Sequence, residues 1–109
     1  MNAYLEITDG PDAGARRPLS NSESVTIGRD ESCELALGDE TVSRRHCRVE
    51  HDGRYWWLRD CGSHNGTLHN GRPVSNCMLY PGDVIRVGHT ELTFRLEEEP
   101  EPDQGHSIL

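Results

Sequence analysis

The chain has 109 residues and a formal net charge of −8 at pH 7, a size that suits one domain with a modest hydrophobic core. Five of its acidic residues lie in residues 97–109, which contain no lysine or arginine. General binding to nucleic acid or to a membrane surface needs a broad basic face, so this acidic chain is expected to do neither.

The N-terminus and the cysteines bear on the cellular compartment. Residues 1–6 show neither the basic start nor the apolar run of a secretory signal, and no stretch reaches transmembrane length. The four cysteines are widely spaced and include no C-x-x-C pair. We therefore expect reduced thiols in a cytoplasmic protein, with no metal and no cofactor.

Short segments in which apolar and polar residues alternate recur along the chain, separated by turn signals. The first, around residues 5–7, ends at Asp9-Gly10-Pro11, and the second, around residues 25–27, leads into Gly28-Arg29. Short strands at such regular spacing predict an all-β sandwich or barrel.

Three later pairs of strand-like segments each flank a turn that contains glycine, and each pair predicts a β-hairpin. The predicted hairpins are residues 47–51 with 54–58 around Asp52-Gly53, residues 67–69 with 72–74 around Asn70-Gly71, and residues 84–87 with 91–95 around residues 88–90.

The last residues differ in composition from the rest of the chain. Residues 97–109 are rich in Glu and Pro and lack the apolar content to pack, so we predict a disordered tail or linker there. The folded domain is expected to span residues 1–96. A linker of this kind would be expected in a larger multidomain protein.

Donor-rich residues gather at three predicted strand ends. Gly28-Arg29 closes one strand, residues 41–46 (Thr-Val-Ser-Arg-Arg-His) lead into another, and residues 60–67 (Asp-Cys-Gly-Ser-His-Asn-Gly-Thr) follow a third. The guanidinium group of arginine pairs bidentately with phosphate and stays charged at any working pH. Three such loops would suit a small anion-binding site.

Taken together, Gly28-Arg29, the block Val42-Ser43-Arg44-Arg45-His46 and the block Asp60-x-x-Ser63-x-Asn65-Gly66-Thr67-x-x-Asn70-Gly71 resemble the signature of the forkhead-associated (FHA) domain in order and spacing. The strand pattern extends the likeness to about residues 3–96. The resemblance implies an eleven-stranded β-sandwich of the FHA/SMAD-like class. It also implies that ligand-binding apical loops hold phosphothreonine in an extended peptide, without catalysis.

The resemblance assigns five residues to the phosphopeptide. Arg29, Ser43 and Arg44 match positions that bind the phosphate in the family. Asn65 matches the residue whose amide pairs with the ligand backbone, which fixes register rather than charge. His64 occupies the variable position beside it, where many members place a side chain near the phosphate.

The remaining motif residues match positions with structural roles. His46 would brace the loops by hydrogen bonds, and Asp60 with Ser63 would tie down the loop that carries Asn65. The other members of this structural set are Gly28, Gly66, Thr67, Asn70 and Gly71, of which the glycines suit backbone positions that need open sterics.

Simpler roles are the alternatives at single positions. Ser43 would merely close a loop, or Arg29 would form a surface ion pair with Asp30, although such pairs contribute only about 0–1 kcal/mol. Cys61 and His64 raise the possibility of a zinc site with His46-Cys47, but Cys47 and Cys61 fall at alternating apolar positions where buried free thiols are ordinary.

Two other functions compete with a phosphothreonine-binding module. One is a phosphate-independent interaction or dimerisation domain on the same fold. The other is a small enzyme that uses Ser43 with His46, for which the sequence offers no third triad member in register. The partner we expect is a protein or peptide phosphorylated on threonine by a Ser/Thr kinase.

Overall fold

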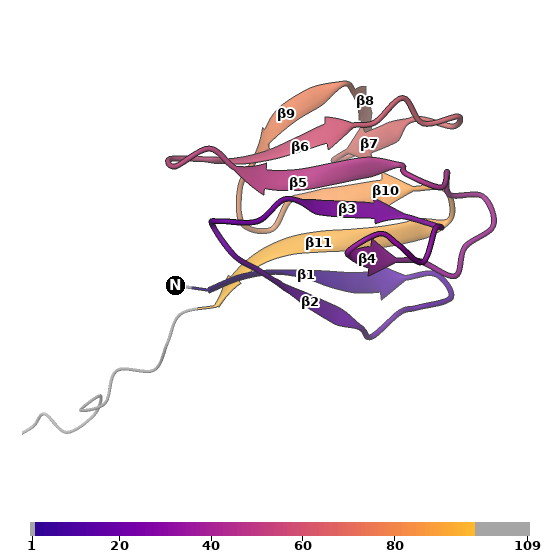
Figure 1. The fold of residues 1–109 in the computed structure, drawn as a ribbon, viewed down its shortest axis with the longest axis horizontal. Helices are drawn as coiled ribbons and strands as arrows, with labels where there is room; N and C mark the ends of the chain where they lie inside the picture. The colour runs from indigo at the N-terminus through magenta and orange to yellow at the C-terminus, as the bar shows by residue number, and fades with distance from the viewer. Residues whose placement is uncertain (1, 98–109) are drawn as a thin grey trace, which may run out of the picture.

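The computed structural model describes residues 2–97, and within them eleven strands form two sheets that pack face to face (Figure 1). The expected eleven-stranded β-sandwich is confirmed. The strands are β1 (Asn2–Asp9), β2 (Arg16–Leu19), β3 (Val25–Gly28), β4 (Leu35–Ala36), β5 (Cys47–His51), β6 (Trp56–Asp60), β7 (Thr67–His69), β8 (Arg72–Val74), β9 (Asn76–Leu79), β10 (Val84–Val87) and β11 (Thr90–Glu97).

The two sheets are almost entirely antiparallel. One sheet has the order β2-β1-β11-β10-β7-β8, and the other has the order β4-β3-β5-β6-β9, in which β3 and β4 pair in parallel. The first and last strands, β1 and β11, are neighbours, with Asn2 opposite Glu97. The two ends of the described chain therefore lie together at one end of the sandwich (Figure 1).

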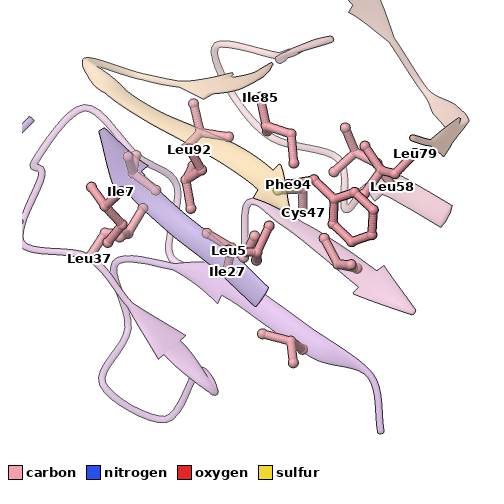
Figure 2. Close-up of a cluster of buried hydrophobic side chains, with 14 of the residues drawn as sticks. Leu5, Ile7, Ile27, Leu37, Cys47, Leu58, Leu79, Ile85, Leu92 and Phe94 are labelled. Atoms are coloured by element: carbon pink, nitrogen blue, oxygen red, sulfur yellow. The ribbon is translucent and has the colours of Figure 1, made fainter. Parts of the chain in front are cut away.

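The core lies between the sheets, where alternate residues of the central strands, such as Leu5 with Ile7 and Leu92 with Phe94, point inward (Figure 2). Burying each large apolar side chain contributes about 1.5–3 kcal/mol, so this layer supplies most of the driving force for folding. The largest fully buried apolar side chains are Phe94, Leu5, Ile7, Ile27, Leu58, Ile85 and Leu92.

Two of the three predicted hairpins form where the sequence placed them. Asn70 and Gly71 have φ angles of 50° and 85°, the left-handed conformation that a two-residue turn between twisted strands requires. The later turn is shorter than expected, because Val87 pairs directly with Thr90. That leaves only Gly88 and His89 between β10 and β11.

The prediction of a two-residue turn at Asp52-Gly53 was wrong. The loop spans residues 52–55, and β6 begins at Trp56. The reason is the Asp52 carboxylate, which accepts hydrogen bonds from the Arg54 and Tyr55 amides at 2.8 and 2.7 Å. These two amides therefore cannot donate to a neighbouring strand, and the strand that was predicted to start at residue 54 starts later.

Strand β11 includes Glu97, the residue at which the tail was predicted to begin. Residues 98–109 lie outside the described residues, so the disordered tail stays a prediction. No helix in the described part of the chain is long and apolar enough to cross a membrane.

Candidate functional site

Three loops meet where β3 ends, β5 begins and β6 ends, at the end of the sandwich away from the N-terminus (Figure 1). We call residues 29–34, 37–46 and 61–66 the apical loops. Backbone hydrogen bonds join them: the Arg29 amide donates to the Ser43 carbonyl at 3.0 Å, and the Cys61 amide donates to the His46 carbonyl at 2.9 Å.

Gly28 allows the second apical loop to pack against the end of β3. A Cβ atom at Gly28 would overlap the Arg44 carbonyl group and lie only 3.0 Å from the Arg45 Cα atom. Backbone atoms cannot move aside cheaply, so a larger residue would push the loop away. The close approach of two backbones, rather than a positive φ, requires glycine at this position.

The Arg29 side chain is exposed, and a hydrogen bond holds its guanidinium group in one orientation. Its Nε atom donates to the Val42 carbonyl at 3.0 Å, which leaves both terminal nitrogens of the guanidinium group available. Arg44 and Arg45 are also exposed. Within residues 2–97, none of these three arginines lies within ion-pair distance of a carboxylate.

The charges of Arg44 and Arg45 affect the pKa of a neighbouring acidic residue, Asp30. Hydrogen bonds from Ser32 are the main cause of a lowered pKa at Asp30, and the positive charges of Arg44 and Arg45 lower it further. The apical loops therefore present a local positive field on a chain that is acidic overall.

The Ser43 side chain is held between two loops. Its Oγ atom accepts a hydrogen bond from the His64 amide at 2.9 Å. An oxygen that is already an acceptor keeps its own hydroxyl proton for another partner. Ser43 is therefore a hydroxyl donor beside Arg29 and Arg44.

His46 is fully buried and links the second and third apical loops. Its Nδ1 atom accepts from the Ser43 amide at 3.0 Å, so Nε2 carries the proton and donates to the Gly66 carbonyl at 2.7 Å. Because backbone groups occupy both ring nitrogens, His46 cannot serve as a base for the Ser43 hydroxyl. This geometry rules against the Ser43–His46 nucleophile.

Asp60 organises the loop that carries Asn65. Its carboxylate accepts from the Ser63 and Thr67 hydroxyls at 2.5 and 2.6 Å and from the Gly62 and Ser63 amides at 2.9 and 3.0 Å. Burial acts to raise the pKa of Asp60, but the bonds from Ser63 and Thr67 outweigh it and lower the pKa.

Asn65 lies exposed at the tip of the third apical loop, where its Nδ2 atom donates to the Thr41 carbonyl at 3.1 Å. The Ser63 hydroxyl in turn accepts from the Gly66 amide at 3.0 Å.

In residues 2–97, no cluster of three or more His, Cys, Asp or Glu is arranged to hold a metal ion.

Comparison with known proteins identifies the family of this arrangement. A solved structure described as a structural and functional analysis of phosphothreonine-dependent FHA domain interactions matches with a TM-score of 0.81 and 37% identity, over 91% of this chain and 100% of that one. The FhaA FHA domain, in a crystal structure with the intracellular domain of Rv3910, matches with a TM-score of 0.77 and 40% identity, over 85% and 99%. The chain belongs to the forkhead-associated domain family.

Whole proteins and a family model also match this FHA domain. The model described as the inner membrane component of T3SS, cytoplasmic domain, covers residues 6–98. FhaA of Mycobacterium tuberculosis is 39% identical over 84% of this chain, and the oxoglutarate dehydrogenase inhibitor of Corynebacterium jeikeium is 38% identical over 85%. The chain spans 17% of the first protein and 64% of the second.

One residue that supports the site of this FHA domain was missed from the sequence. Asp39 is buried, and it accepts from the Thr41 amide and hydroxyl at 2.9 and 2.6 Å, from the His89 amide at 2.9 Å and from the Thr90 hydroxyl at 2.8 Å. Burial acts to raise the pKa of Asp39, but these bonds lower it to about 2. An Asp two residues before Thr is a local turn signal, whereas the contact with Thr90 spans the fold.

Two motif residues of the FHA domain lie away from the apical loops. Asn70 and Gly71 form the turn at the opposite end of β7, where the Asn70 side chain accepts from the Val84 amide at 2.8 Å and donates to Asp83 at 3.2 Å. The structure thus brings the other predicted site residues together around the apical loops and places this pair in a separate turn.

Proposed function

We propose that this FHA domain binds a phosphothreonine peptide across its apical loops and thereby recruits a partner that a Ser/Thr kinase has phosphorylated. A phosphate group carries about −1.5 to −2 charge at pH 7 and three strong acceptor oxygens. Such a group needs charged donors from several directions. Arg29, Ser43 and Arg44 offer such donors from two separate loops.

The observation that carries this proposal is the hydrogen bonding of Ser43. Its oxygen accepts from the His64 amide, while its own amide donates to the buried His46 ring. The hydroxyl is therefore held in place before any ligand arrives, and its proton remains available. Donors fixed in advance bind an anion without a further cost of ordering.

Each site residue then has a defined part in the proposal. Arg29 and Arg44 pair with the phosphate oxygens, and Ser43 donates its hydroxyl proton to a third. Asn65 keeps one amide proton and its side-chain oxygen for the backbone of the peptide, because only one amide proton is used by Thr41. His64, which directly precedes Asn65 in the same loop, lies beside the phosphate.

Calorimetric titration of the full chain tests the proposal. Peptides selected from an oriented phosphothreonine library should bind, whereas the same peptides without phosphate should not. Ser43→Ala should weaken binding without changing the fold. Equal binding of both peptides would instead support the phosphate-independent interaction domain.

We extend the proposal to the setting of the domain. The four cysteines are free thiols, as a reducing compartment allows, so we place the protein in the cytoplasm. The Glu- and Pro-rich composition of residues 98–109 suits a linker to other parts of a larger protein.

A further inference from the structure

The two sheets end in four edge strands, and three of these are protected against pairing with another chain. β2 contains Pro18, β8 contains Pro73, and β4 is only two residues long. Proline and short length are common devices that keep sheet edges from pairing. β9, with the sequence Asn-Cys-Met-Leu, has neither proline nor charge, and Figure 1 draws no described segment beyond it.

The outward backbone groups of β9 belong to Asn76 and Met78. The Asp60 amide of β6 donates to the Ser75 carbonyl at 2.8 Å. Along an antiparallel ladder, residues alternate between those that bond to the neighbouring strand and those that do not. Every second residue from Ser75 therefore faces β6, and Asn76 and Met78 point away. Within residues 2–97, no loop or side chain bonds to their backbone groups.

We propose that β9 pairs antiparallel with β9 of a second copy of this chain, about a two-fold axis at Cys77. In this register Asn76 of each copy lies opposite Met78 of the other, so each outward N–H meets an outward C=O. An axis at Met78 would need Tyr80 to bond as well. The Tyr80 amide already donates to the Asp83 carboxylate at 2.9 Å, and its carbonyl accepts from the Asp83 amide at 3.0 Å.

A second copy suits this edge better than a charged partner does. Like charges that face each other across a strand pair are destabilising, and β9 has none. Its outer face carries Met78 beside Tyr80, which is 54% exposed, and Trp57 lies opposite Met78 on β6. On the neighbouring strands, Arg59 and Glu50 form an ion pair at 2.7 Å. In the proposed register Met78 of each copy would thus face Asn76 of the other, and neither β9 strand carries a charge.

The pairing leaves the phosphopeptide site open. β9 lies on the side of β6 that faces away from β5. The apical loops lie at the ends of β3, β5 and β6 rather than along the edge of the sheet. A two-fold axis perpendicular to the sheet makes the apical loops of the two copies point in opposite directions. Because paired four-residue strands bury little area compared with the about 1,200–2,000 Å² of stable complexes, the dimer is weak and depends on concentration.

Sedimentation of the full chain tests the dimer. From about 1 μM to about 1 mM, the range of weak association, the mass should rise from 12.3 kDa toward twice that value. Met78→Pro removes an outward N–H but no bond to β6, so this variant should keep its fold and stay monomeric. Met78→Leu keeps the N–H and should dimerise like the parent. A parent chain that stays monomeric, or a folded Met78→Pro variant that dimerises as well, overturns the proposal.

Thiol cross-linking tests the register without altering the backbone. Facing residues that do not exchange hydrogen bonds have Cα atoms about 4.5 Å apart, within the about 4.4–6.8 Å that a disulfide allows. In a Cys61→Ser background, diamide should take up the two thiol hydrogens and join Cys77 of one copy to Cys77 of the other. This covalent dimer should vanish in Cys77→Ser. Its absence at concentrations where the mass is doubled would overturn the register.

Discussion

Within residues 2–97, most arginines on the strands of the two sheets lie within ion-pair distance of a carboxylate, whereas those of the apical loops do not. On the outer face of one sheet, Arg48 and Arg59 both pair with Glu50, at 2.9 and 2.7 Å. On the other sheet, Arg95 pairs with Glu6 at 2.6 Å. These exposed pairs contribute little to stability, typically about 0–1 kcal/mol, but they reduce the positive charge on the faces of the sheets.

The positive charges of the apical loops are not paired with a carboxylate within residues 2–97. Arg29 is held by a neutral carbonyl at 3.0 Å rather than by a carboxylate, and within residues 2–97 Arg44 has no acidic partner at ion-pair distance. The location of unpaired positive charge, rather than the net charge of the chain, therefore indicates where an anion binds to an acidic protein.

The largest expected effect comes from replacing phosphothreonine by aspartate or glutamate in the peptide. A carboxylate offers one charge and two oxygens in a plane, so it cannot satisfy Arg29, Ser43 and Arg44 together. Peptides with either acid should show no measurable heat of binding in calorimetry. Binding of these peptides comparable to the phosphopeptide would mean that the apical loops recognise negative charge alone.

Removing the charge of one apical arginine should have the next largest effect on affinity. Arg29→Ala should weaken phosphopeptide binding by about 2–5 kcal/mol, the cost of deleting one partner of a desolvated charge pair. Arg45→Ala should cost less than about 1 kcal/mol, because we place its side chain in solvent. The control Arg95→Ala, on the sheet face, should bind like the parent. The assignment fails if Arg45→Ala rather than Arg29→Ala abolishes binding.

Two aspartates with the same lowered pKa should differ in their effect on stability. Asp39 is buried within the second apical loop and Asp52 is exposed at the opposite end of the sandwich, and each has a pKa of about 2. The depressed pKa of Asp39 corresponds to about 2 kcal/mol at neutral pH. Asp39→Asn should remove this amount, whereas Asp52→Asn should cost less because water screens an exposed carboxylate.

The pH dependence of unfolding checks this difference. The folded-state pKa of Asp39 lies below the usual 3.8, so its contribution is present above about pH 4 and is lost as the pH falls through about 2. Urea unfolding between these pH values should therefore show a shallower loss of stability in Asp39→Asn than in the parent. An identical slope in both proteins would contradict the assignment.

The smallest expected effect concerns a single methyl group of the ligand. Phosphothreonine should bind more tightly than phosphoserine in the same peptide, by about 0.8 kcal/mol for the methyl removed from water. The β-branch also restricts the side chain before binding. Paired titrations of the two peptides measure the difference, and equal affinities would show that the apical loops offer the methyl no apolar surface.

The sequence by itself determined the class of fold and predicted the residues of the candidate site. Asn70-Gly71 predicts its own turn because two adjacent residues that tolerate positive φ are enough to reverse a strand pair. The motif residues Arg29, Ser43 and Asn65 were likewise predicted from local blocks in register, and the structure places all three in the apical loops.

Only the tertiary structure decided the contacts between residues far apart in the chain. Asp39 bonds to Thr90 across 51 positions, and Gly28 is needed because another loop crosses it closely. The open edge at β9 was hidden for the same reason, since strand order within a sheet does not follow chain order. Local sequence sets backbone conformation residue by residue, whereas these features depend on which surfaces pack together once the core has formed.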